Sequence, residues 1–153
     1  MHSRHITLML LSAVATGLSA CSTEPTAPLA DITGQWRLSL VWAVPGGQRC
    51  SLHDVVLTLH LIAAGQPAPY SADLTGGSGT CTANGQSTPI QAQPRTADSA
   101  YYAQGSFRMV IGQEHFTGVS VGAHLSGNYS EQLAGTPSAQ FLVTGTWSAT
   151  QAP

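Results

Sequence analysis

The chain has 153 residues with 5 basic and 7 acidic side chains, a formal net charge of −2, and no lysine. Such a sparse and slightly acidic charge set argues against binding to nucleic acids or anionic lipids, which needs clustered positive charge. The absence of lysine excludes a Schiff-base mechanism. The length fits one domain with a substantial hydrophobic core.

Residues 1–20 have the pattern of an export signal. Arg4 supplies positive charge ahead of an apolar run from Ile6 to Leu18, which is too short to span a membrane. The sequence Leu18-Ser19-Ala20-Cys21 resembles the lipobox of bacterial lipoproteins, in which the cysteine is acylated and becomes the first residue of the mature chain. The resemblance implies lipidation at Cys21. An ordinary secretory signal that leaves Cys21 as a free thiol is the alternative.

Residues 21–30 are the lipidated cysteine and a small, polar, proline-bearing segment, which we expect to form an extended tether. Ser22 stands where an aspartate signals retention of lipoproteins in the inner membrane. The resemblance therefore implies export and anchoring at the periplasmic face of the outer membrane. We divide the chain into a signal peptide (1–20), a tether (21–30) and one domain (31–153).

Cys50 and Cys81 remain once Cys21 is assigned to the lipid. An even pair of cysteines in an exported chain favours a disulfide, which would close a loop of about thirty residues. Two buried free thiols or a metal site are the alternatives. They fit less well, because the two cysteines are far apart and no C-x-x-C motif or cysteine-histidine cluster accompanies them.

From Trp36 onward, large apolar residues alternate with a period of two, which predicts β-strands with one buried face. The first run extends from Trp36 to Val44 and ends at a turn marked by Pro45-Gly46-Gly47. A second run covers residues 52–62, and weaker strand signals occur at 74–82 and 88–93. Further strands are expected at 101–111, 115–121, 123–130 and 141–149.

About eight consecutive strands without a helical period predict an all-β domain, an antiparallel up-and-down β-barrel, with a β-sandwich as the alternative. Glycines inside the strands favour the barrel, because strongly bent strands need them. These glycines are Gly105, Gly118, Gly127 and Gly145.

Gly34-Gln35-Trp36 resembles the G-x-W motif that opens the first strand of lipocalins, and the preceding Ile32-Thr33 extends the similarity to the avidins. In both families the tryptophan plugs one end of an up-and-down barrel. Residues 34–38, together with Cys50-Ser51-Leu52, also resemble the periplasmic inhibitors of serralysin-type metalloproteases, which are disulfide-bearing barrels. All three resemblances imply the same lipocalin-like barrel.

Large side chains on the predicted apolar faces are candidates for lining a ligand cavity. They are Trp36, Trp42, Tyr101, Phe107, Met109 and Trp147. A cavity open at one end would be lined by Trp42, Phe107 and Met109. Core packing is the alternative interpretation, because a barrel of this size is just wide enough for side chains to fill it.

No catalytic, metal or cofactor site is expected. The histidines of the domain are His53, His60, His115 and His124, and none has a metal-ligand spacing. His53-Asp54 and Glu114-His115 are sequence neighbours, so their side chains should point to opposite faces of a strand. Gly76-Gly77-Ser78-Gly79 is predicted to be a flexible loop, since it lacks the spacing of a nucleophile elbow and the helix that a phosphate site requires.

The sequence favours an exported, membrane-tethered, non-enzymatic binding module for a small apolar ligand. The alternative is a protein-binding module, such as a periplasmic protease or lysozyme inhibitor. An enzyme ranks third, because no catalytic constellation emerges. The expected partners are the membrane, through Cys21, and either a small ligand or a periplasmic protein, with no nucleic acid.

Overall fold

The computed structural model describes residues 31–133 and 141–153. These residues form β1 (Gly34–Val44), β2 (Gln48–Leu61), β3 (Ala68–Thr75), β4 (Ser78–Ala83), β5 (Gln86–Gln91), β6 (Arg95–Thr96), β7 (Ser99–Ala103), β8 (Ser106–Ile111), β9 (Glu114–Val121), β10 (His124–Leu133) and β11 (Phe141–Gln151). Among them, no helix is long and apolar enough to cross a membrane.

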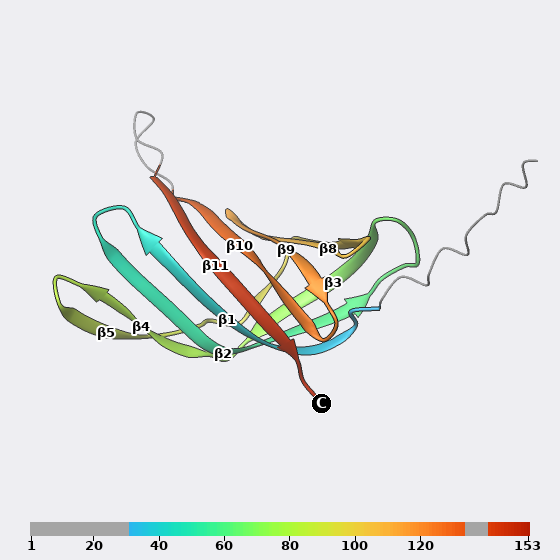
Figure 1. Ribbon diagram of the computed structural model, residues 1–153, viewed down its shortest axis with the longest axis horizontal. Helices are drawn as coiled ribbons and strands as arrows, with labels where there is room; N and C mark the ends of the chain where they lie inside the picture. The colour runs from blue at the N-terminus through green and yellow to red at the C-terminus, as the bar shows by residue number, and fades with distance from the viewer. Residues whose placement is uncertain (1–30, 134–140) are drawn as a thin grey trace, which may run out of the picture.

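An antiparallel barrel of 8 strands confirms the predicted fold (Figure 1). The ring runs β1-β2-β3-β7-β8-β9-β10-β11, and β11 pairs with β1 to complete it. Apart from the step from β3 to β7 and the closing pair of β11 and β1, neighbouring strands of the ring follow one another in sequence. The inserted β4 and β5 form a hairpin that flares away from the barrel (Figure 1). The short β6 pairs with β3 at the margin of the ring.

β2 belongs to both the barrel and the hairpin, because its 14 residues make it longer than β3 or β4, the two strands that pair with it on the same edge. Residues 56–61 pair with β3 within the ring, whereas residues 49–53 pair with β4 of the hairpin. A β-bulge separates the two halves: Ser39 of β1 lies opposite both His53 and Asp54, and Asp54 has a φ of 56°. Because of the extra residue, Leu52 before the bulge and Val55 after it both point inward, although they are three positions apart. The apolar side chains of both halves of β2 therefore face the barrel interior.

Hairpin turns of two residues occur at Asn84-Gly85, Gln104-Gly105, Gly112-Gln113 and Gly122-Ala123, and the first residue of each has a positive φ. Positive φ at this position is typical of hairpin turns that match the twist of the strands. The Gln104-Gly105 turn shows that the prediction of a single strand over 101–111 was wrong, since β7 and β8 lie on either side of it. Across such a turn in the barrel the inward positions change between even and odd numbers, as from Tyr102 to Phe107 and from Ile111 to Phe116.

The prediction for 74–82 was also wrong, because these residues belong to the end of β3 and the start of β4. Gly76 and Gly77 separate the two strands, and both have a positive φ. Ser78 and Gly79 begin β4, so the expected loop is shorter than predicted. The expectation of a glycine inside a strand holds at three positions, whereas Gly105 lies in a turn.

Two glycines leave space for aromatic rings to contact each other inside the barrel. Gly118 of β9 and Gly127 of β10 are register partners, flanked by Phe107 on β8 and Trp147 on β11. The two rings meet over this pair of glycines with their centroids 5.6 Å apart. The Trp147 indole N–H donates to two main-chain carbonyl oxygens, so the buried indole leaves no unpaired donor.

One end of the barrel, which we call the closed end, is solidly filled. Trp36 lies there with 1% of its surface exposed and donates from its indole N–H to the carbonyl oxygen of Ile32, at 3.0 Å. Trp36 also pairs in register with Gln151, so both ends of the domain meet at the closed end. Side chains that are at most 1% exposed fill the interior behind it, among them Leu57, Leu59, Phe107, Met109 and Leu125.

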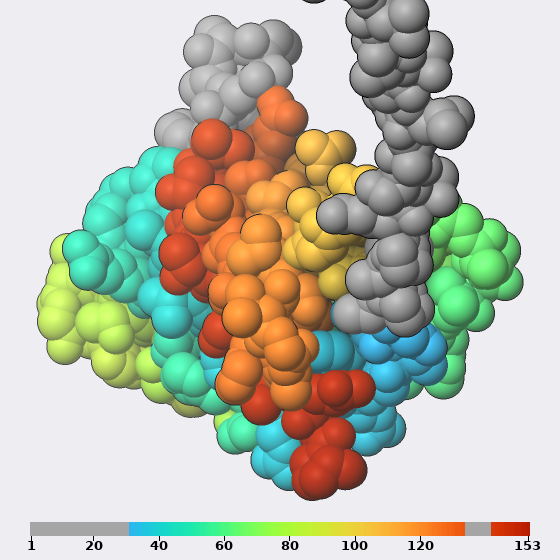
Figure 2. Space-filling model, turned by 45° about the vertical axis from the view of Figure 1, so that its right-hand side comes forward, coloured from blue at the N-terminus to red at the C-terminus, as the bar shows by residue number. Residues whose placement is uncertain are grey.

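The outer surface follows the alternation predicted for the last strand. Figure 2 shows the face on which β10 and β11 run side by side, between β1 and β9. The outward positions of β11 are exposed and mostly polar: Leu142, Thr144, Thr146 and Ser148. The inward Val143, Trp147 and Ala149 are buried, as expected for a strand with one face on the core.

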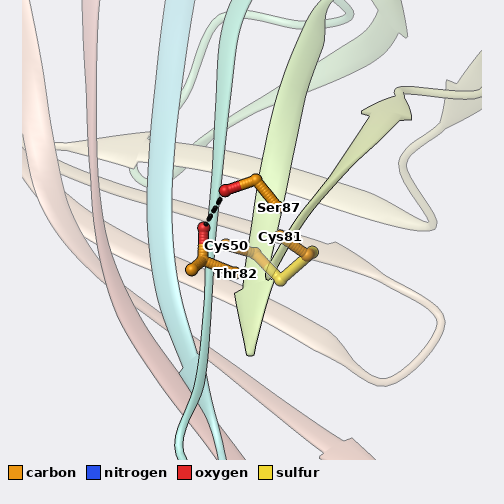
Figure 3. The surroundings of a disulfide bond; sticks show 4 residues. All are labelled: Cys50, Cys81, Thr82 and Ser87. Carbon is orange, nitrogen blue, oxygen red and sulfur yellow. Dashed lines mark hydrogen bonds between the residues drawn. A yellow bond between two sulfur atoms is a disulfide. The ribbon is translucent and has the colours of Figure 1, made fainter. Parts of the chain in front are cut away.

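A disulfide between Cys50 and Cys81 joins β2 to β4 and confirms the predicted pair (Figure 3). The two cysteines are register partners in the β2–β4 ladder. Beside them, the hydroxyls of Thr82 and Ser87 share a hydrogen bond of 2.9 Å that ties β4 to β5 (Figure 3). The disulfide thus adds a covalent crosslink between the inserted hairpin and the barrel to the main-chain connection.

Replacement of both cysteines, Cys50→Ser with Cys81→Ser, should lower the free energy of unfolding by about 3 to 4 kcal/mol, the loop-entropy value for a crosslink of this span. Urea titration followed by tryptophan fluorescence measures the loss, with the oxidised wild type as the control. Hydrogen exchange should accelerate first in β4 and β5. An unchanged midpoint and unchanged exchange would show that strand pairing alone holds the hairpin.

Candidate functional site

An open pocket of about 500 Å³, which we call the end pocket, occupies the end of the barrel opposite the closed end. Its walls combine inward positions of β1, β2, β3, β8, β9 and β10 with the segment that follows the inserted hairpin. The lining residues are Leu38, Leu40, Trp42, Leu52, Val55, Leu74, Ile90, Gln91, Ala92, Gln93, Arg95, Ile111, Glu114, Phe116, Tyr129 and Glu131. Most of the lining is therefore apolar.

An aromatic wall runs along one side of the end pocket. Trp42 of β1 and Tyr129 of β10 are both register partners of Gly145, which lies between them on β11. Their rings meet across this glycine with centroids 6.4 Å apart. A Cβ atom on Gly145 would overlap the carbonyl oxygen of Val41 and lie 2.7 Å from the Cβ of Trp42, so a side chain there would displace β1 together with the indole. Phe116 continues the wall, with its centroid 5.1 Å from that of Tyr129.

A second wall comes from residues 90–93, at the end of β5 and after it. The backbone N–H of Ala92 donates to the carbonyl oxygen of Gly77 at 3.1 Å, and that of Ala97 donates to Ala72 at 2.8 Å. These bonds fix the segment against the base of the hairpin and against β3. The inserted hairpin therefore supplies a wall that the barrel strands alone would lack.

The charged side chains of the lining gather on one part of the end pocket. Glu114 and Glu131 are register partners on β9 and β10, and both occupy inward positions. The guanidinium of Arg95, on β6, donates from Nη1 to Oε1 of Glu114 at 2.5 Å. The hydroxyl of Tyr129 donates to Oε2 of Glu131 at 2.9 Å.

Burial governs the protonation of this cluster. Only 15% of the Glu114 side chain is exposed, and burial raises the pKa of its carboxyl group. The hydrogen bond and charge of Arg95 lower that pKa in part, and the charge of Glu131 raises it further. Burial, followed by the charge of Glu114, also raises the pKa of the Tyr129 phenol. Tyr129 thus remains a protonated donor to Glu131 at neutral pH.

Of the side chains predicted to line a cavity, Trp42 lines the end pocket. Four others are at most 3% exposed in the packed core behind it: Trp36, Phe107, Met109 and Trp147. The prediction for Tyr101 was wrong: its side chain lies on the outer surface and is 43% exposed, whereas the neighbouring Tyr102 is buried. The two-residue turn after β7 is the reason. Core and cavity thus occupy different levels of one barrel.

Sequence reasoning missed the polar part of the end pocket. Tyr129 and Glu131 continue the inward positions of Leu125 and Gly127 at steps of two, so the alternation of β10 contained this signal. No local pattern marks Arg95, because its position depends on how the segment after the hairpin crosses the barrel.

Within the described residues, the histidines lie on exposed outward positions of separate strand segments: His53, His60, His115 and His124. His53 and Asp54 share a shallow outer groove with Ser51 and Ser78. Asp54, however, lies 3.7 Å from Arg37, and both of these side chains are more than two-thirds exposed. In the part of the chain that the structure describes, no group of three or more His, Cys, Asp or Glu side chains could hold a metal ion.

Comparison with known proteins adds no family to this picture. Neither the protein-family models, nor the curated proteins, nor the solved structures contain a match to the chain. The functional argument therefore rests on the end pocket, its aromatic wall and its charged cluster.

Proposed function

We propose that this chain is an exported, lipid-anchored and non-enzymatic binding module that holds a small, largely apolar molecule in the end pocket. The observation that carries the proposal is an open, mostly apolar pocket of about 500 Å³ in a barrel whose other end is filled. Sites for small molecules typically measure about 300 to 1,000 Å³, with apolar walls and a few polar groups.

The resemblance to lipocalins supports the same proposal. In lipocalins the tryptophan of the G-x-W motif plugs one end of the barrel, and Trp36 occupies the closed end here. Barrels of this size are wide enough to hold one small ligand, as in lipocalins. The inserted β4–β5 hairpin is a departure from a plain up-and-down barrel, and it adds a wall to the end pocket.

Titration with the neutral apolar fluorophore N-phenylnaphthylamine tests the proposal. We expect saturable enhancement of its fluorescence at one site per chain, reversed by competing apolar molecules. The variant Ala92→Trp places an indole in the end pocket and should weaken binding by at least about tenfold. A loss of about 1.4 kcal/mol of binding free energy through steric overlap is enough for that factor. Ala92 is partly exposed, so the barrel should still fold.

The matched control is Ala43→Trp, the same substitution at an exposed position of β1 that does not line the end pocket. This variant should bind the fluorophore like the wild type. If the folded wild type took up no apolar probe, the proposal would be wrong, and the alternative of a protein-binding module would gain weight. Equal weakening by both variants would place the probe somewhere other than the end pocket.

A further inference from the structure

We infer that the end pocket selects amphiphiles with a cationic head group, an ammonium on an apolar tail, which binds between Glu131 and the aromatic wall. This inference rests on the proposed function, because it specifies the ligand of the same pocket. It starts from the placement of Glu114 and Glu131 opposite each other on inward positions of β9 and β10.

Two carboxylates in such a cross-strand pair destabilise a sheet, because like charges directly opposite each other repel. Here one carboxylate is neutralised: Arg95 donates to Glu114, which is 15% exposed. With one guanidinium against two carboxylates, the lining carries a net charge of −1. The uncompensated charge is that of Glu131.

The Glu131 carboxylate can also accept further hydrogen bonds. A carboxylate accepts at about four lone-pair positions, and the side-chain bond from Tyr129 to Oε2 uses one of them. An ammonium group brings three donors and a positive charge, so it would fill free positions and relieve the repulsion between the two glutamates. A carboxylate or phosphate head would meet that repulsion instead.

The aromatic wall favours the same head group. Trp42 and Tyr129 line the end pocket beside Glu131, and their rings meet 6.4 Å apart across Gly145. The faces of tryptophan and tyrosine rings attract cations, most strongly where water is partly excluded. The apolar tail would then extend toward Leu38, Leu40 and Val55, which line the pocket and are buried.

Calorimetric titration with decylammonium, decanol and decanoate, below their micelle concentrations and at neutral pH and low salt, tests this inference. The three probes share one tail and differ in the head. We expect decylammonium to bind about fivefold more tightly than decanol, which matches the contribution of a partly exposed hydrogen bond between charged groups. Decanoate should bind most weakly of the three. In Glu131→Gln, which keeps an acceptor for Tyr129, the preference for ammonium over alcohol should disappear while decanol binds as before.

Asp54→Asn is the matched control, since it removes an exposed outer carboxylate, tolerates the positive φ at this position and should keep the preference. If Glu131→Gln did not fold, Glu114→Gln would serve as the second variant, because it removes the net negative charge and should also reduce the preference. Equal affinity for all three probes in the wild type would overturn the head-group inference and leave the proposed function standing. Binding of none of them would overturn both.

Discussion

Gly127→Ala should destabilise the barrel by about 3 kcal/mol or more, at the upper end of the cost of overpacking a core. A Cβ atom on Gly127 would overlap the main chain of β9 at Thr117 and Gly118. Main chain cannot move aside as a flexible side chain can, so β9 and β10 would have to separate. The substitution should also displace Trp147, which is the neighbour of Gly127 on β11 and bonds to main-chain oxygens at Thr117 and Asn128.

Urea unfolding followed by tryptophan fluorescence measures this loss, and near-ultraviolet circular dichroism reports the displaced indole. Gly65→Ala is the matched control: the nearest atom to its added Cβ lies 4.0 Å away, and no positive φ is required there. That variant should be as stable as the wild type or gain a few tenths of a kcal/mol. A Gly127→Ala protein within about 0.5 kcal/mol of the wild type would contradict the close strand contact.

The barrel was predictable because its strands keep their alternation over long runs. Trp36, Leu38 and Leu40 are all buried, as the period of two requires, and the intrastrand glycines were recognised as bends. The errors occurred where one or two residues change the inward positions. Gln104-Gly105 reverses them between β7 and β8. The bulge at His53 and Asp54 shifts them within β2, so these two side chains share an outer groove, and the prediction that they point to opposite faces was wrong. Neither site carries an Asn-Gly or Asp-Gly signal for a hairpin turn.

The candidate site was less predictable than the fold. Trp42 was expected on the apolar face, but alternation cannot tell which level of a barrel is packed and which is open. That distinction depends on register: Trp147 and Phe107 fill the core over a pair of glycines, whereas Trp42 and Tyr129 leave space beside them. The wall at residues 90–93 depends on contacts with Gly77 and β3, which no local pattern encodes.

Cys21→Ala should transfer nearly all of the protein from the membrane fraction to the soluble fraction. If Cys21 is acylated, as the lipobox resemblance implies, its acyl chain contributes about 0.8 kcal/mol of membrane affinity for every buried methylene group. The sparse, slightly acidic charge set offers little electrostatic attraction to replace that anchor. Metabolic labelling with a clickable fatty acid, combined with fractionation of wild type and variant, measures both acylation and location.

The control for this experiment is the double variant Cys50→Ser with Cys81→Ser, which should remain labelled and membrane-bound because it keeps Cys21. A Cys21→Ala protein that still sediments with membranes would contradict the anchor. The described domain begins at the closed end, where Asp31 accepts a hydrogen bond from the hydroxyl of Tyr70. Trp42 lies six residues beyond Trp36 along β1, about 20 Å at the rise of a strand. A lipid at Cys21 would therefore be joined to the domain at its closed end, at the opposite end of the barrel from the end pocket.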